Sequence, residues 1–321
     1  MKLIPAFPIE RPSYEEATTD YNLLTKLNIS LSDGNWYSRS KVSGTKYIDV
    51  DKTGMKTSNH YHWMARMACD SAASPSPIRS WYTDKFRAGL EASIYYEKSH
   101  ASALALRKYI PAQFRPSAAK ALIDHFNVKT LYDPCGGGGD RLVAAQACGI
   151  EYHCRDVNPL VFSGYAAQQQ EYGGNVSFEL KGAETDAPIE DYFDMVFTSP
   201  PYYKIEKYQG DEQSHIKYKH FDDWIEYFLL PMLENSLKAL KPNGVLAINI
   251  SDVYVNHTVN DLTTPVINFV VNNCKDVSYI GYRMNKRPNS SISNQQGIFA
   301  EPIITGRKSA QGTTWLKPNL F

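Results

Sequence analysis

Short apolar runs alternate with helical stretches from about residue 128 to residue 306. Seven runs have the length and the β-branched or aromatic content of buried strands: residues 129–133, 151–156, 176–180, 194–198, 244–250, 278–284 and 299–306. Helical spacing of apolar residues fills the intervals at 141–148, 162–172, 221–240 and 264–274. Strands that alternate with helices form a mostly parallel sheet covered by helices. The sequence therefore predicts an α/β, doubly wound fold with a seven-stranded, Rossmann-like sheet.

The first 110 residues have a different character. Residues 31–63 are polar, aromatic and rich in turns, residues 71–77 read as a linker, and residues 81–110 have helical spacing. We predict an additional, partly helical N-terminal module at 1–110, a catalytic domain at 111–310 and a C-terminal tail at 311–321. Residues 36–110 hold 12 Lys/Arg against 6 Asp/Glu in a chain of zero net charge. This surplus suits a docking face for phosphates, although a solvated surface gives the same count.

The cysteines and the apolar runs exclude several classes of protein. The five cysteines are scattered without a C-x-x-C pair, which argues against disulfides and a zinc site. His60, His62 and Cys69 lack a fourth ligand at a usual zinc spacing, so we expect no metal. No run approaches the roughly 20 apolar residues that span a bilayer, and the N-terminus lacks the apolar core of a signal peptide. We expect an intracellular, cytoplasmic protein without a membrane partner.

The first predicted strand of the sheet runs into a glycine-rich loop. The segment Asp133–Leu142 reads DPCGGGGDRL and opens a helix. Consecutive glycines allow the backbone to turn and to approach a ligand closely, and a helix N-terminus offers free N–H groups. The loop lacks the G-K-[ST] of a Walker A sequence and fits G-x-G-x-x-G poorly. It predicts a ligand site of another kind.

The second predicted strand ends at Asp156, at the same edge of the sheet as the glycine loop. An acidic side chain there can accept hydrogen bonds from both hydroxyls of a ribose. The loop and Asp156 together predict a cofactor that carries a nucleoside with free hydroxyls. The structural alternative is a tight turn followed by an aspartate that caps a helix. The sequence TSPPYY at the end of a later strand favours the cofactor site over this alternative.

In these motifs the chain resembles the S-adenosylmethionine-dependent DNA amino-methyltransferases, which modify the exocyclic nitrogen of cytosine or adenine. The family's cofactor motif D-P-F-x-G-x-G is matched by Asp133, Pro134, Gly137 and Gly139, with Cys135 in place of the usual Phe. The catalytic motif [DNS]-P-P-[YFW] is matched by Ser199, Pro200, Pro201 and Tyr202. Many members of the family also have a segment with a proline that closes over the methionine part of the cofactor. Phe114, Arg115, Pro116 and Ser117 resemble this segment. The resemblance covers about residues 111–308 and implies that S-adenosylmethionine is the cofactor and that these residues bind it or act in catalysis.

The chemistry of amine methylation explains why such a motif is stiff. The lone pair of an exocyclic amine is delocalised into the ring, and acceptors that hold both N–H bonds out of the ring plane favour the nucleophilic, pyramidal form. The Ser199 side chain and the Pro200 carbonyl could supply these acceptors, and two prolines fix the φ angles that aim the carbonyl. Tyr202 would stack on the base, which must be flipped out of a duplex to be reached. A proline-stiffened strand exit is the structural alternative.

The first residue of the motif bears on the substrate. In this family Ser is commonest in cytosine-N4 enzymes and Asp or Asn in adenine-N6 enzymes, so we predict a DNA methyltransferase acting on cytosine N4. The alternatives are an N6-adenine DNA methyltransferase, an RNA methyltransferase and a non-catalytic DNA-binding protein on the same fold.

Basic residues near the motif and in the N-terminal module are candidates for DNA contact. Cations interleaved with aromatic rings suit a grip on nucleotides, although a mobile surface loop has the same composition. The candidates beside the catalytic sheet are Lys204, Lys207, Arg283, Lys286 and Arg287. Those in the N-terminal module are Arg39, Lys41, Lys46, Arg79, Lys85 and Arg87. No insertion large enough for DNA recognition lies between the two motifs, so the N-terminal module is the candidate for that role.

Overall fold

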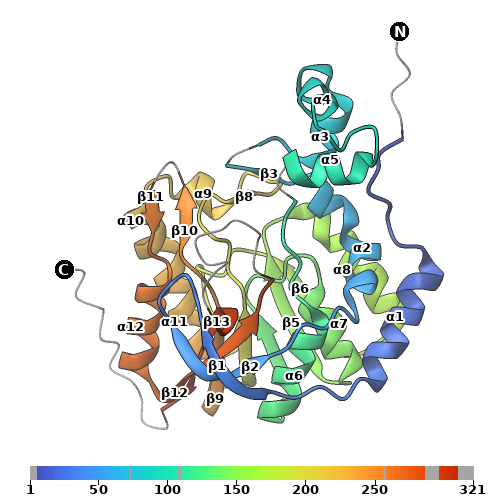
Figure 1. The fold of residues 1–321 in the computed structure, drawn as a ribbon. Coiled ribbons are helices and arrows are strands. Elements are labelled where there is room, and N and C mark those ends of the chain that lie inside the picture. Colours follow the sequence, from blue (N-terminus) through green and yellow to red (C-terminus); the bar gives the residue numbers. More distant parts are fainter. Residues whose placement is uncertain (1–5, 73, 108–109, 256–257, 286–295, 310–321) are drawn as a thin grey trace.

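The fold centres on a nine-stranded sheet, as a computed structural model of residues 6–72, 74–107, 110–255, 258–285 and 296–309 describes it (Figure 1). The strand order is β1-β2-β12-β13-β9-β7-β4-β5-β6. The strands are β1 (Ser32–Tyr37), β2 (Ser43–Ile48), β4 (Thr130–Asp133), β5 (Glu151–Asp156), β6 (Val176–Leu180), β7 (Phe193–Thr198), β9 (Leu240–Asn249), β12 (Cys274–Arg283) and β13 (Ile298–Lys308).

The seven predicted strands are confirmed, and they form the mostly parallel part of the sheet. Strands β6, β5, β4, β7 and β9 are mutually parallel, whereas β13 runs antiparallel to both β9 and β12. The crossover from β6 to β7 carries the chain back past β5 and β4, so the sheet is doubly wound. The carboxyl ends of β4, β5, β6 and β7 therefore meet at one edge, where such folds bind their ligands.

Helices cover both faces of the sheet (Figure 1). One face carries α6 (Pro116–Phe126), α7 (Asp140–Ala147) and α8 (Pro159–Tyr172). The other carries α10 (Phe221–Trp224), the π-helix η1 (Ile225–Leu229), α11 (Leu230–Ala239) and α12 (Thr263–Asn273). Each layer of helices shares one apolar core with the strands beneath it, since β5 and α6 line the first core and β9 and α11 line the second.

The segment predicted as one long helix over 221–240 is continuous but irregular. It begins as α10, passes through the π-turn η1 and continues as α11, which has Pro231 in its first turn. Proline has no N–H to complete an α-helical bond and its ring crowds the preceding turn, which explains the wider turn before it. The turn sequence at 241–244 is absorbed as a bulge in β9, where Asn243 has a φ of 66°.

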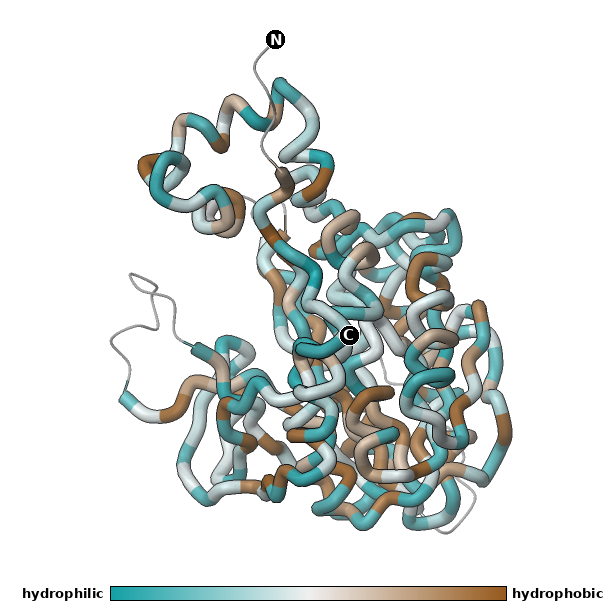
Figure 2. Tube along the Cα trace, turned by 90° about the vertical axis from the view of Figure 1, so that its right-hand side faces the viewer, coloured by the Kyte–Doolittle hydropathy of each residue, from teal (hydrophilic) through white to brown (hydrophobic). Residues whose placement is uncertain are grey.

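The N-terminal residues contribute to the main body as well as to an appendage. Strands β1 and β2 extend the sheet beside β12 and β13, and the helices α1 (Tyr14–Lys26) and α2 (Met55–Met67) pack near α7 and α8. The helices α3 (Pro77–Tyr82), α4 (Asp84–Glu91) and α5 (His100–Arg107) form the appendage. Its small core contains Trp81, Leu90 and Leu104, and Figure 2 shows that it projects from the body. The domain boundary near residue 110 stays a prediction. Within residues 1–110, only the described helices α3–α5 form the appendage, whereas β1, β2, α1 and α2 pack on the main body.

Two short strand pairs and the remaining helix lie near the carboxyl edge (Figure 1). They are β3 (Asp70–Ser71) with β8 (Glu206–Lys207), β10 (Val253–Val255) with β11 (Thr258–Asn260), and the helix α9 (Ser214–Lys217). The predicted tail at 311–321 lies outside the described residues. In the part of the chain that the structure describes, no helix has both the length and the apolar character needed to span a bilayer.

Candidate active site

A cavity of about 610 Å³ opens at the carboxyl ends of β4, β5, β6 and β7. Its wall includes the glycine loop after β4, Asp156 at the end of β5, Lys181–Glu184 after β6 and Ser199–Tyr202 after β7. This volume lies within the range of pockets that hold small ligands and cofactors. The structure thus brings both predicted motifs into one cavity.

Asp133 lies beneath the glycine loop and does not line this cavity. Its fully buried carboxylate accepts hydrogen bonds from Arg141 Nε (2.6 Å), the Tyr152 hydroxyl (2.7 Å), Thr198 Oγ1 (2.8 Å) and the Cys135 N–H (3.3 Å). Arg141 also donates to the Cys135 carbonyl at 2.6 Å. Asp133 therefore shapes the loop from below, and a direct contact with the cofactor is not available to it in this arrangement.

The glycines of the loop have separate tasks. Gly137 lines the cavity at a φ of 54°, a conformation that other residues rarely adopt. Gly139, at a φ of 70°, caps α7 and does not line the cavity. A Cβ added to Gly139 would lie 2.4 Å from His62 Nε2, so the absence of a side chain lets α2 pack against the loop. Pro134 and Cys135 line the cavity, and their contact with the cofactor stays a prediction.

Asp156 lines the cavity, and its carboxylate also holds the glycine loop. One oxygen accepts from the Gly137 N–H and the other from the Asn158 N–H, both at 2.7 Å. Burial raises the pKa of Asp156, and these backbone hydrogen bonds oppose the increase. Each carboxylate oxygen retains a second lone pair, so Asp156 can accept further hydrogen bonds from a ligand.

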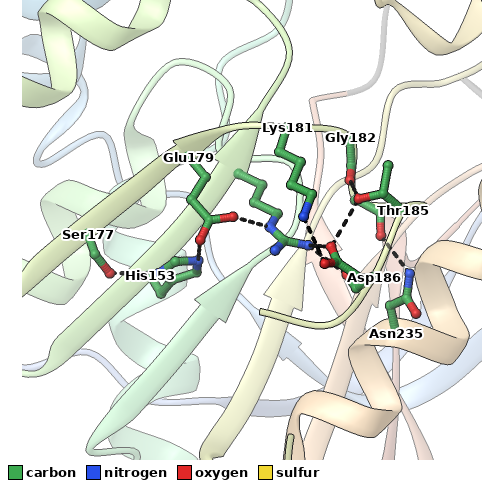
Figure 3. A network of polar contacts seen from close by, with 10 residues as sticks. His153, Ser177, Glu179, Lys181, Gly182, Thr185, Asp186 and Asn235 are labelled. Atoms are coloured by element: carbon green, nitrogen blue, oxygen red, sulfur yellow. Dashed lines mark hydrogen bonds and ion pairs between the residues drawn. The ribbon is translucent and has the colours of Figure 1, made fainter. Parts of the chain in front are cut away.

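The loop after β6 is fixed by a polar network beside the cavity (Figure 3). The buried Arg155 donates to Glu179 Oε2 at 2.8 Å and to the carbonyl and carboxylate of Asp186 at 2.6 and 2.9 Å. Lys181 Nζ donates to the same Asp186 carboxylate at 2.7 Å. Because Lys181–Glu184 line the cavity, this network gives one cavity wall a defined shape.

Ser199, Pro200, Pro201 and Tyr202 all line the cavity. The Tyr202 hydroxyl donates to Glu301 Oε1 at 3.0 Å and lies 3.4 Å from the Asn249 carbonyl. Glu301 lines the cavity as well, and burial raises the pKa of its carboxyl group. Burial also raises the pKa of Tyr202, which therefore stays a neutral donor. The Tyr202 ring is thus held from its hydroxyl end by an acid on β13.

The predicted segment before α6 divides between cavity and core. Phe114 and Arg115 line the cavity, whereas Pro116 and Ser117 begin α6 and are buried away from it. The Arg115 guanidinium lies over the Tyr282 ring, 4.7 Å from its centroid. The Phe114 ring stacks on the same tyrosine.

Among the DNA-contact candidates beside the catalytic sheet, Lys204, Lys207 and Arg283 lie outside the cavity wall. Lys204 Nζ donates to the Lys219 carbonyl at 2.6 Å, Lys207 lies in β8, and Arg283 pairs with Asp49 at 2.7 Å. Lys286 and Arg287 lie outside the described residues.

Residues 204–219 form a strap that contributes Ile205, Glu206, Tyr208 and residues 212–214 to the cavity wall. Its β8 pairs with β3, and Gln209 Nε2 donates to the Ala68 carbonyl at 3.0 Å. Lys217 Nζ forms an ion pair with Glu184 at 2.8 Å. The strap therefore connects the catalytic motif with the N-terminal residues and with the loop after β6.

Several cavity residues could not be found by local motifs. They are Arg66, Gln113, Asp140, Asn249 and Glu301. Asp140 directly follows the glycine run, and Glu301 is an acid within the mostly apolar run at 298–304. Among the described residues, no cluster of His, Cys, Asp and Glu could hold a metal ion.

Comparisons with solved structures find methyltransferases at low similarity. A tRNA (m1A58) methyltransferase, TrmI, from Aquifex aeolicus is 14% identical, with 63% of this chain and 72% of that chain covered and a TM-score of 0.40. An rRNA methylase from Streptococcus thermophilus is 14% identical, with 62% and 99% covered and a TM-score of 0.38. The magnesium protoporphyrin IX methyltransferase ChlM from Synechocystis PCC 6803, with bound SAM, is 9% identical, with 60% and 79% covered and a TM-score of 0.41. No curated protein matches the chain significantly.

A family comparison gives the more direct result. Residues 193–314 match the N6_N4_Mtase family, described as DNA methylase. The matched segment contains the catalytic motif at Ser199–Tyr202 and the acid at Glu301, and it begins after the glycine loop. This match confirms the resemblance carried by the catalytic motif: residues 193–314 are similar to the N4/N6 DNA methylases, which supports a methyltransferase with S-adenosylmethionine as its cofactor.

Proposed function

We propose that the protein methylates the exocyclic amine of a flipped-out base in DNA, with cytosine N4 as the target. The observation that carries the proposal is that Ser199–Tyr202 and the glycine loop with Asp156 line one cavity. A base and a cofactor bound there would meet at the carboxyl ends of β4 and β7.

The cavity residues divide the work of holding the two reactants. Asp156 accepts hydrogen bonds from the ribose hydroxyls of the cofactor. Gly137 has no side chain, so the cofactor can approach the backbone of the glycine loop closely. When bound, S-adenosylmethionine supplies an electrophilic sulfonium methyl group. Ser199 Oγ and the Pro200 carbonyl accept the two amine N–H groups and keep the nitrogen lone pair free.

Tyr202 holds the base and Glu301 holds Tyr202. The ring stacks on the extrahelical base, while its hydroxyl stays bonded to the partly buried carboxyl group of Glu301. The two prolines fix the aim of the acceptor carbonyl, which contributes orientation to the transition state. No strong base is required, because the amine becomes acidic only after the methyl group has been transferred.

DNA affinity comes from the N-terminal residues in this proposal. Three of the six candidate cations are paired within the protein: Lys46 with Asp33, Arg79 with Asp70, and Arg87 with Asp84. Arg39 lies at the cavity wall over the Phe299 ring. Lys41 and Lys85 are exposed and are the candidates for phosphate contact.

Transfer of a labelled methyl group from S-adenosylmethionine tests the proposal. Double-stranded DNA should accept label, and matched RNA should not. Tyr202→Ala should remove most of the transfer to DNA, whereas Tyr227→Ala, at an exposed tyrosine away from the cavity, should retain it. Label on RNA alone would replace DNA by RNA as the substrate, and full activity of Tyr202→Ala would refute the role of the motif.

A further inference from the structure

One end of the cavity holds a buried carboxylate that neither motif explains. Asp140 opens α7 directly after the glycine loop and lines the cavity. Its Oδ1 accepts from Ser58 Oγ at 2.5 Å and from Gln113 Nε2 at 2.9 Å. Its Oδ2 has no hydrogen-bond donor among the described residues, where no Lys or Arg forms an ion pair with Asp140 either. A buried carboxylate without an ion-pair partner is costly, and a ligand cation bound at Oδ2 would offset this cost.

A positive group stands next to this carboxylate. Arg66, from α2, lines the same end of the cavity and donates to Gln113 Oε1 at 3.4 Å and to the Pro111 carbonyl at 2.9 Å. The amide of Gln113 thus connects Arg66 to Asp140. A carboxylate and a guanidinium on either side of one amide are complementary to a zwitterion, which carries an ammonium and a carboxylate on one carbon.

The part of the cofactor that reaches this end follows from the strand order if the cofactor base lies against the loop after β6. Asp156 ends β5, Lys181–Glu184 follow β6, the glycine loop follows β4, and Ser199 follows β7. With the ribose at β5, a cofactor base that lies over β6 leaves the rest of the molecule at β4 and β7. The amino-acid tail then ends at the start of α7, where Asp140 stands.

We propose that Asp140 is the counter-ion for the ammonium group in the amino-acid tail of the cofactor, held in place by Ser58 and Gln113. This inference rests on the assignment of S-adenosylmethionine to the cavity and adds residues that the cofactor motif does not contain. Because Ser58 and Arg66 belong to α2, the N-terminal residues complete the cofactor site.

Binding measurements on the full chain test this assignment without turnover. The probes are S-adenosylhomocysteine and its des-amino analogue, which differ only in the ammonium group. Loss of a hydrogen bond to a charged group weakens binding by about tenfold or more, so Asp140→Asn should lower the affinity for S-adenosylhomocysteine by that factor. Its affinity for the des-amino analogue should stay within about twofold of that of the unsubstituted protein.

Asp156→Asn is the matched control, because it changes an aspartate of the same cavity that faces the ribose common to both probes. It should weaken both ligands by similar factors. An Asp140→Asn protein that binds S-adenosylhomocysteine normally, or that loses both ligands equally, would overturn the assignment. Failure of the unsubstituted protein to bind S-adenosylhomocysteine would instead refute the cofactor site itself.

Discussion

Replacing Asp133 by Asn should destabilise the protein strongly, because it breaks a buried ion pair under the glycine loop. The exposed fractions of the Arg141 and Asp133 side chains are 5% and 0%, and Arg141 Nε lies 2.6 Å from Asp133 Oδ2. The introduced asparagine side chain could take two orientations. With its amide nitrogen at the Oδ2 position, it would place a donor against the Arg141 guanidinium. With the nitrogen at the Oδ1 position, it would place a donor against the Cys135 N–H and Thr198 Oγ1. Either rotamer leaves a buried guanidinium without its counter-charge.

The expected loss of unfolding free energy is about 3–5 kcal/mol, the cost of removing one partner of a buried pair. Urea unfolding followed by tryptophan fluorescence measures it. Asp33→Asn is the matched control, since it removes an ion pair with Lys46 in which both side chains are mostly exposed, and it should cost no more than about 1 kcal/mol. If Asp133→Asn lost less than about 1 kcal/mol as well, the buried pair would not support the loop.

Three further predictions concern the other parts of the site. Tyr202→Phe and Glu301→Gln should each lower the turnover number more than the affinity for S-adenosylhomocysteine. The double substitution should raise the activation free energy by less than the sum of the two single effects, because both remove the same hydrogen bond. Additive effects would contradict this coupling between Tyr202 and Glu301. Burial lowers the pKa of His62 to about 4. The neutral ring therefore stabilises the folded state at pH values above the unfolded pKa of about 6.5, and this contribution should be lost as the pH falls toward 4. The free energy of unfolding of His62→Asn should lack this part of the pH dependence. DNA binding should weaken steeply with salt, and Lys85→Ala should make the log–log slope shallower by about one unit; an unchanged slope would remove Lys85 from the DNA surface.

The central strands were predictable because they are buried on both faces. Runs such as β7 and the second half of β9 are mostly apolar and almost fully buried, so they stand out against their surroundings. The strands β1 and β2, at one side of the sheet, were not predicted, because their sequences SDGNWY and SGTKYI are polar and their burial is mostly partial or absent. They pair with each other and join the sheet through β12 and β13, which are distant in sequence.

The site was predictable where its residues are neighbours in sequence. The glycine loop and Ser199–Tyr202 each form a local backbone shape that their own residues impose. The pairing of Tyr202 with Glu301 and of Asp140 with Ser58 joins residues far apart in the chain, and only the folded sheet brings them together. Asp133 was expected at the cofactor, and the structure instead places it among four protein donors beneath the loop.

Mass spectrometry of nucleosides tests the proposed function most directly. DNA without prior methylation would be incubated with the protein and S-adenosylmethionine, digested to nucleosides and compared with DNA incubated with the Tyr202→Ala variant. We expect N4-methylcytosine that depends on both the cofactor and Tyr202. N6-methyladenine in its place would keep the mechanism and change the base, whereas the absence of any methylated nucleoside would contradict methyl transfer to DNA by this cavity.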